Sequence, residues 1–264
     1  MTKIIYRIAL AGILLIVVCF TGCKKKTDPV STQPTPAPAN GTVMLHLHTN
    51  IDTNEVDAYN QNYFMAGGRK VSLSIAQLYI SSIQLVKSDG STYDMSGVNI
   101  LKLMQQEEYV VGSVPPGNYK SIRFNVGLAP ATNTMVPAIA DSTLNHPNMW
   151  FGNSAQPSGY VFLNLQGKID TSAAANNTTA QMQPFVYRIG TNAHLKNVSM
   201  PDENYTVVSS QAHFIHIIID YSKLFNGITL TLAGNLNVNS VSDNTSALSN
   251  QITNNIPLMF SYEE

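Results

Sequence analysis

The chain has 264 residues, of which 15 are Lys or Arg and 16 are Asp or Glu, so its formal net charge is −1. A balance this close to neutral provides no basic surface for nucleic acid, which excludes a nucleic-acid-binding protein. The length is sufficient for one large or two small domains with a substantial hydrophobic core.

The N-terminal segment has the three parts of a secretory signal peptide. Lys3 and Arg7 give a positively charged start, residues 8–20 are apolar, and the small residues Thr21 and Gly22 follow. The apolar run is too short to cross the roughly 30 Å hydrocarbon core of a bilayer, because a spanning helix needs about 20 residues. We therefore predict an export signal that is cleaved, and not a permanent membrane span.

Cys23 is predicted to carry a lipid anchor. Residues 20–23 read Phe-Thr-Gly-Cys and resemble the bacterial lipobox, in which the cysteine is diacylated on sulfur and becomes the new N-terminus. Cleavage of the signal peptide, residues 1–22, also removes Cys19, so the exported chain has no thiol for a disulfide or a Cys–metal site. We expect a lipoprotein of the bacterial cell envelope, attached to the outer membrane and facing the periplasm or the cell surface.

Residues 23–41 are predicted to form a flexible tether. After Cys23 come three lysines and then Thr, Pro, Ala and Ser, a composition with too few large apolar side chains to pack. Prolines such as Pro34 and Pro36 favour extended polyproline geometry. The rest of the chain, residues 42–264, is predicted to be one folded domain.

Alternating apolar and polar residues dominate the folded part. In residues 43–48, Val43, Leu45 and Leu47 share one face of a predicted strand and the intervening residues share the other. Further predicted strands, many of them rich in β-branched and aromatic residues, are 71–86, 98–103, 119–126, 160–169, 185–189, 212–221, 228–238 and 257–262. The fold is predicted to be all-β, an antiparallel β-sandwich with long loops and at most short helices.

Long polar stretches separate some of these strands and are predicted to be loops. They are residues 50–70, 129–159, 170–183 and 239–254. Short helices are expected near residues 135–141 and 222–225. The second stretch contains Trp150, the one tryptophan of the chain, between Met149 and Phe151. A simple linker would not carry so much apolar surface.

His46 and His48 are the first candidates for metal ligands. Because they are two residues apart on a strand, their side chains project to the same face about 6–7 Å apart at the backbone, and imidazole suits copper or zinc. An ordinary solvent-facing strand would show the same alternation, so the pair alone does not decide between the two readings. His213 and His216 are three apart and project to opposite faces, so only one of them can join such a site.

The sequence contains no recognisable catalytic motif. It has no Gly-x-Ser-x-Gly elbow, no His-Glu-x-x-His helix and no phosphate-binding loop. It also lacks Cys-x-x-Cys-His, which haem attachment would need. We therefore expect a binding protein and not an enzyme.

Several segments occur in the order seen in the MbnP family, which is named for a partner of methanobactin operons and contains many exported lipoproteins. The matching segments are residues 78–85, 88–90, 116–119, 122–127, 149–151, 158–167 and 219–227, and the closing Phe260. The chain resembles this family from about residue 42 to its C-terminus. The resemblance implies an all-β domain that, in the characterised branch of the family, binds copper through histidines.

The resemblance also implies a partner and particular residues. In the characterised branch a tryptophan is oxidised to kynurenine by a dihaem enzyme related to cytochrome c peroxidases. His48 matches the family's histidine at the end of the first strand, and Trp150 falls in the aromatic loop where the family usually has two tryptophans. Tyr187-Arg188 stands where the family has a histidine after tyrosine, and His194 follows shortly afterwards.

Together these observations predict a copper-binding lipoprotein that handles the metal and is not itself the oxidant. The predicted metal ligands are His48 and His46, with His146, His194 and His213 as further candidates. Trp150 is a candidate for the oxidised aromatic residue, although it matches the first aromatic position of the family's loop and need not be the tryptophan that is oxidised. The alternative is a structural or ligand-binding surface lipoprotein without metal. Its aromatic loop around Trp150 would then contact a sugar or a protein.

Overall fold

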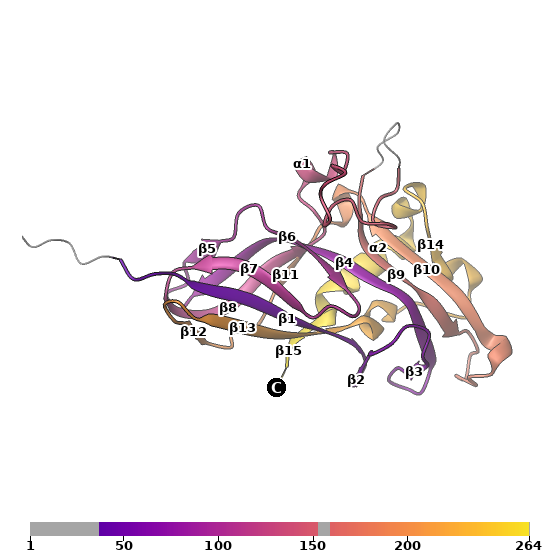
Figure 1. Ribbon diagram of the computed structural model, residues 1–264. Coiled ribbons are helices and arrows are strands. Elements are labelled where there is room, and N and C mark those ends of the chain that lie inside the picture. Colours follow the sequence, from indigo (N-terminus) through magenta and orange to yellow (C-terminus); the bar gives the residue numbers. More distant parts are fainter. Residues whose placement is uncertain (1–36, 153–158, 264) are drawn as a thin grey trace, which may run out of the picture. The chain divides into compact units, whose positions relative to one another are not determined.

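Figure 1 shows the computed structural model, which describes residues 37–152 and 159–263. The predicted signal peptide, the predicted lipid attachment site at Cys23 and the tether as far as residue 36 lie outside these residues. Residues Pro38–Glu264 form one compact unit, and every strand and helix described below belongs to it.

The described residues form mainly strands, which confirms the predicted fold class. The strands are β1 (Gly41–Ile51), β2 (Asn54–Glu55), β3 (Tyr63–Phe64), β4 (Lys70–Lys87), β5 (Thr92–Asp94), β6 (Asn99–Leu103), β7 (Glu108–Val114), β8 (Gly117–Val126), β9 (Val161–Asp170), β10 (Met182–Gly190), β11 (Lys196–Ser199), β12 (Tyr205–Val207), β13 (Ala212–Asp220), β14 (Asn237–Val238) and β15 (Phe260–Tyr262). The α-helices are α1 (Pro130–Asn133) and α2 (Ala247–Asn255). The 3₁₀ helices are η1 (Thr179–Gln181), η2 (Asn192–His194), η3 (Tyr221–Phe225), η4 (Ala233–Leu236), η5 (Ser242–Thr245) and η6 (Ile256–Met259).

The strands make two sheets that pack against each other. One sheet has the order β15-β13-β1-β2, with β7 also paired to β1. The other has the order β11-β8-β4-β9-β10-β14, with β12 on β8 and with β3, β5 and β6 on β4. The rings of Phe124 on β8 and Phe260 on β15 meet edge to face with centroids 5.0 Å apart, so the two sheets touch directly. This arrangement confirms the predicted sandwich.

The pleat of β1 follows the alternation in its sequence. Val43, Leu45 and Leu47 are fully buried in the core that both sheets share, whereas His46 and His48 lie on the other face and are only partly covered. Since successive side chains on a strand point to opposite faces, burial of the three apolar residues forces both histidines outwards. The hydrophobic pattern therefore sets which residues can meet on the outer face.

Most strand pairs are antiparallel, as predicted, but β1 and β13 run parallel, as do β10 and β14. In Figure 1 the indigo β1 and the orange β13 lie side by side, although they come from opposite ends of the sequence. Their register pairs His46 with His216 and Leu47 with Ile217. His46 and His216, which come from distant segments, thus become neighbours.

The predicted strand at residues 228–238 is largely wrong. Only Asn237–Val238 is a strand, and it follows the 3₁₀ helix Ala233–Leu236. Asn235 donates from its side-chain amide to the carbonyl of Thr229, and its backbone amide donates to Leu232. Such local hydrogen bonds compete with a sheet ladder and turn the chain.

The predicted helix at residues 135–141 is also wrong, because the helix in this loop is α1 and ends at Asn133. The expected helix at residues 222–225 is confirmed as part of η3. The predicted loop at residues 239–254 contains most of α2, which begins after the capping residue Ser246, whose side chain accepts from the amide of Ser249. Strand β7 was not predicted. None of the helices within the described parts of the chain is long and apolar enough to span a membrane.

Candidate metal centre

Three histidines meet on the outer face of the sheet that contains β1. His46 and His48 come from β1, and His216 comes from β13. The Nδ1 atoms of His46 and His216 are 3.0 Å apart, and one ring nitrogen from each of the three lies within 4.8 Å of the others. The parallel register therefore adds a third imidazole to the pair that the sequence predicted.

The three rings are packed closely. Ring centroids are 4.3 Å apart for His46 and His48, 4.8 Å for His46 and His216, and 6.4 Å for His48 and His216. The side chains of His46, His48 and His216 are 21%, 12% and 44% exposed to solvent, respectively. The centre is thus half-buried on its β1 side and open to solvent on its β13 side.

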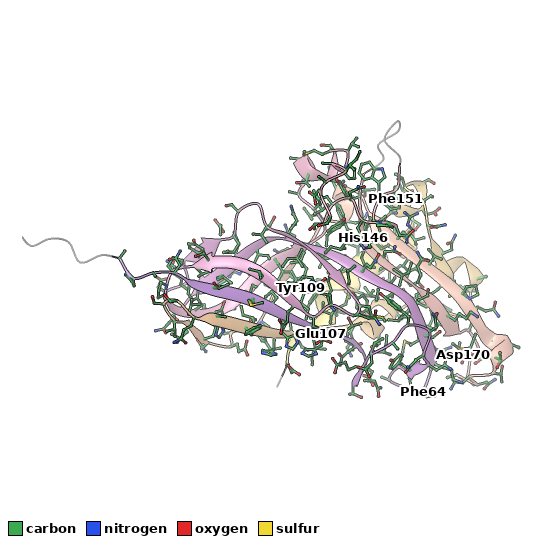
Figure 2. The ribbon with its side chains drawn as sticks, in the orientation of Figure 1. Phe64, Glu107, Tyr109, His146, Phe151 and Asp170 are labelled. Carbon is green, nitrogen blue, oxygen red and sulfur yellow. The ribbon has the colours of Figure 1, made fainter. Side chains whose placement is uncertain are left out.

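Three glutamates surround the histidines. Glu107 Oε2 lies 3.1 Å from Nε2 of His46, and Glu55 Oε1 lies 2.8 Å from Nδ1 of His48. Glu263 Oε2 lies 3.1 Å from Nδ1 of His216. Figure 2 shows Glu107 beside β1, where these groups gather. A cation bound among the histidines would thus be surrounded by negative charge, which favours it electrostatically.

His48 presents a buried nitrogen without a hydrogen bond. Its Nε2 atom is inaccessible to solvent and has no hydrogen-bond partner among the described residues. Glu263 Oε2 is 3.3 Å away, but the angles do not meet those of a hydrogen bond. An unsatisfied buried nitrogen is costly for a folded protein unless some other group satisfies it. A metal ion accepts a lone pair from such a nitrogen.

A groove of about 340 Å³ opens beside the centre. Glu203, Tyr205, His213, His216 and Glu263 are among the residues that line it. Burial raises the pKa of the Glu203 carboxyl, and charge on His216 opposes this shift. The groove gives small solutes access to the exposed side of the three histidines.

The structure keeps the other predicted histidines away from this cluster. His213 lies on the opposite face of β13, where its ring stacks on Tyr205 with centroids 4.8 Å apart. Burial lowers the pKa of His213, and nearby His216 adds to the effect. His194 is almost fully buried in η2, and its Nδ1 pairs with the hydroxyl of Thr191. Burial also lowers the pKa of His194.

The aromatic loop is likewise separate from the histidine cluster. Trp150 pairs with Tyr160 beside β9 in the other sheet, and their rings meet with centroids 4.7 Å apart. The Trp150 carbonyl accepts a hydrogen bond from Arg188. His146 lies in the same loop, with Nδ1 near the carbonyl of Pro147. Figure 2 shows His146 and Phe151 near α1, well apart from Glu107.

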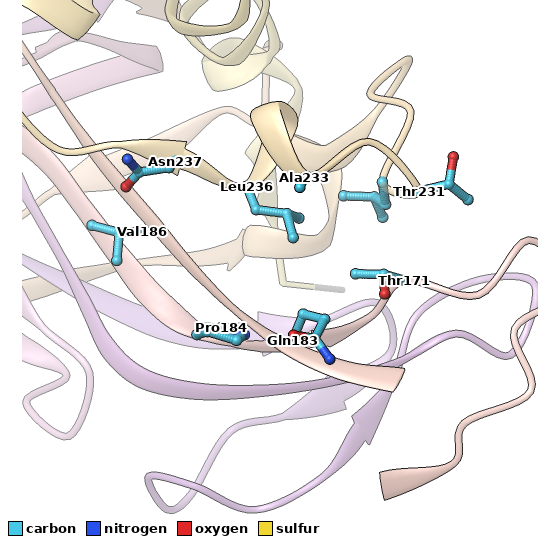
Figure 3. A pocket seen from close by; sticks show the side chains of 9 residues that line it. Thr171, Gln183, Pro184, Val186, Thr231, Ala233, Leu236 and Asn237 are labelled. Carbon is cyan, nitrogen blue, oxygen red and sulfur yellow. The ribbon is translucent and has the colours of Figure 1, made fainter. Parts of the chain in front are cut away.

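A cavity of about 410 Å³ lies elsewhere, between β10 and the segment that leads to β14 (Figure 3). Its lining includes Pro184, Val186 and Leu236 together with polar uncharged residues such as Thr171 and Gln183. None of the residues that line it carries an imidazole, thiol or carboxylate. This cavity therefore offers no site for a transition metal.

Sequence reasoning did not identify His216, Glu55, Glu107 or Glu263 as members of the cluster. A signal for His216 was present, since it alternates with the apolar Ile215 and Ile217 and must face outwards when they are buried. Glu55, Glu107 and Glu263 do not belong to an alternating pattern of this kind, so their neighbours in the sequence do not indicate that they face the histidines.

Comparison with known proteins identifies the family. The sequence model of MbnP matches residues 40–244. The chain belongs to the MbnP family. This membership confirms the predicted resemblance, and the match includes His46, His48 and His216 but stops before Glu263. Among solved structures, MbnP from Methylosinus trichosporium is similar to this chain. The match covers 70% of this chain and 77% of that protein, with 14% sequence identity and a TM-score of 0.45. No curated protein matches the chain.

Proposed function

We propose that this member of the MbnP family binds one copper ion through His46, His48 and His216 and acts as a metal-handling protein, not as an enzyme. The buried and unsatisfied Nε2 of His48 is the observation that carries the proposal. Imidazole nitrogens suit copper, zinc and other late transition metals. Copper is chosen among them because the MbnP resemblance implies it.

The spacing of the nitrogens fits a single ion. In tetrahedral zinc sites, two imidazole nitrogens that bind one ion at about 2.0–2.1 Å are about 3.3 Å apart, which sets the scale for a late transition metal. The Nδ1 atoms of His46 and His216 are 3.0 Å apart, so a shift of a few tenths of an ångström brings them to that separation. His216 is the most exposed of the three and can make this adjustment.

We also propose that the protein is anchored to the outer membrane of the bacterial cell envelope through a lipid on Cys23, and that its folded domain faces the periplasm or the cell surface. A dihaem partner that oxidises Trp150 stays a prediction from the resemblance. The position of Trp150 in the other sheet supports a role for that residue outside the coordination of the ion at the histidine cluster.

Isothermal titration of the purified chain with Cu(II), and with Cu(I) under anaerobic conditions, tests this function. We expect one ion per chain for the wild type, and His46→Ala, His48→Ala and His216→Ala each to weaken binding by at least about 10-fold, the loss seen even for supporting groups of metal sites. His146→Ala and His213→Ala remove an imidazole outside the cluster and serve as matched controls that retain wild-type affinity. Absence of stoichiometric binding, or equal binding by all five variants, would refute the proposal.

A further inference from the structure

The glutamates around the cluster determine which ring nitrogens carry hydrogen. A carboxylate only accepts hydrogen bonds, so Nδ1 of His48, 2.8 Å from Glu55, must be the protonated nitrogen of that ring. By the same argument Nε2 of His46, 3.1 Å from Glu107, carries the hydrogen of its ring. Neutral imidazoles so oriented have lone pairs on His48 Nε2 and His46 Nδ1.

Both lone pairs lie on the side of the cluster that contains His216 and Glu263. His46 Nδ1 is 3.0 Å from His216 Nδ1, and His48 Nε2 is 3.3 Å from Glu263 Oε2. Glu263 Oε2 is in turn 3.1 Å from His216 Nδ1. By the same rule His216 Nδ1 carries a hydrogen in the metal-free chain, so an ion that binds this nitrogen must displace that hydrogen, which leaves as a proton to solvent. One carboxylate oxygen therefore lies within reach of the nitrogens to which an ion would bind.

The backbone fixes Glu263 in this place. Strand β15 pairs antiparallel with β13 and ends at Tyr262, opposite Ile217. The amide of Glu263 then donates to the carbonyl of His216. This bond places the backbone of Glu263 next to His216, from where its carboxylate reaches the imidazole.

We propose that Glu263 is the fourth ligand of the ion at His46, His48 and His216, and that Glu55 and Glu107 are positioning residues that orient two of these rings. The inference rests on the proposed function and deepens it. The result is a centre with three nitrogens and one carboxylate oxygen, which selects a divalent ion over Cu(I).

The donor set gives the reason for this selectivity. A carboxylate is a hard, negatively charged ligand that suits divalent ions, whereas Cu(I) is soft and is selected by thiolate and thioether groups. Glu263 therefore contributes more to the binding of Cu(II) than to that of Cu(I). The positioning residues resemble the carboxylates that hold the second nitrogen of a metal-bound histidine in many metal sites.

A second arrangement of the same groups has to be distinguished. One donor atom each from His48, Glu55 and Glu107 also lies within 4.8 Å of the others. An ion there would have to displace the hydrogen of His48 Nδ1 that Glu55 accepts. Such an ion would also have one imidazole ligand, whereas the proposed site offers three. Glu55 and Glu107 therefore stay hydrogen-bond acceptors in the proposal, and the inference requires a stoichiometry of one ion per chain.

The ligand role is tested on the purified full chain with Cu(II), and with Cu(I) in competition with a chromogenic chelator. We expect Glu263→Gln to weaken Cu(II) binding by at least about 10-fold and to change its electron paramagnetic resonance spectrum, while Cu(I) binding falls by less than about threefold. Asp94→Asn removes an equal charge from β5 of the other sheet and serves as the matched control. If Glu263→Gln weakens Cu(II) and Cu(I) equally, or neither, Glu263 is not a ligand.

The positioning role is tested by a conservative pair. Glu55→Gln keeps an oxygen that can accept from His48 Nδ1, so we expect its Cu(II) affinity to stay within about threefold of wild type, whereas Glu55→Ala loses about 10-fold or more. Equal losses in both variants, or two ions bound to the wild type, would overturn the positioning role. A wild type that binds no copper would instead refute the proposed function itself.

Discussion

His46 and His216 are 170 positions apart in the sequence, yet their Nδ1 atoms lie 3.0 Å apart because they are direct partners in the parallel pair of β1 and β13. An ion held by both imidazoles would connect a strand near the start of the folded unit to one near its end. Metal binding and the stability of this sheet should therefore be coupled.

Thermal unfolding should reveal this coupling. A ligand that binds only the folded state adds about 2.7 kcal/mol to the free energy of unfolding at 100 times its dissociation constant. For a domain of this size, that gain raises the melting temperature by about 5–10 °C. We expect this rise on addition of Cu(II) to the wild type and to the His146→Ala variant, measured by scanning calorimetry, and a rise no more than about half as large in His216→Ala, because 10-fold weaker binding lowers the stabilisation to about 1.4 kcal/mol. A rise of equal size in His216→Ala would contradict the coupling.

Local alternation was sufficient to predict β1 and the outward projection of His46 and His48. The same rule places His213 and His216 on opposite faces of β13, but it does not say which strand lies beside β1. Parallel pairing of β1 with β13 is a long-range property, decided by how the two sheets share their core. His216, and not His213, faces the same side as His46 and His48 because Ile215, Ile217 and Ile219 are buried. The alternation of β13 predicts this only if these isoleucines are already assumed to face the core.

The carboxylates were beyond sequence reasoning for a different reason. Glu107 precedes a strand that was not predicted, and Glu263 follows the last strand, so neither belongs to a pattern that points at the histidines. Helix α2 was missed because its residues are mostly Ser, Asn, Gln and Thr, while its buried face rests on a few side chains such as Ile252. A mostly polar sequence can therefore form a helix that packs against the rest of the domain, and hydrophobic periodicity does not detect it.

Trp150 should be dispensable for metal binding at the histidine cluster. Its ring packs against Tyr160 in the other sheet, so replacing it by Ala removes an aromatic contact and part of a smaller hydrophobic cluster. We expect Trp150→Ala to lower the free energy of unfolding by about 1–2 kcal/mol. Because distant sites act independently, copper affinity should stay within about twofold of wild type. A loss of affinity comparable to that of His48→Ala would place Trp150 in the coordination of the ion.

Gly167 lies where β9 passes close to β4. A Cβ atom added there would overlap the carbonyl oxygen of Ser72, which belongs to the backbone and cannot move aside cheaply. We expect Gly167→Ala to destabilise the protein by about 3 kcal/mol or more, as measured by urea denaturation. Gly234→Ala is the control, because outside the neighbouring residues and backbone of its own short helix no described atom lies within 4 Å of the added Cβ. Similar stabilities of the two variants would show that β4 and β9 are less closely packed than described.

Lys102 is a fully buried lysine whose ammonium donates to the carbonyls of Leu103, Met104 and Gln106. Burial lowers its pKa to about 8, against the opposing influence of Glu107 and Glu55. In the unfolded chain a lysine has a pKa of about 10.4. Between these two values the unfolded state binds more protons than the folded state, so stability must rise with pH in this window.

The sign and size of this effect can be measured by urea denaturation between pH 7.5 and 9.5. Over this range the contribution of Lys102 to the free energy of unfolding should rise by about 2 kcal/mol. The buried tyrosines complicate absolute values, since they act in the opposite direction as the unfolded chain begins to ionise near pH 10. The wild type and Lys102→Met share these tyrosines, so the effect of the tyrosines cancels in the difference between their free energies of unfolding. We expect this difference to shift in favour of the wild type as the pH rises, whereas parallel curves would show that Lys102 stays charged throughout.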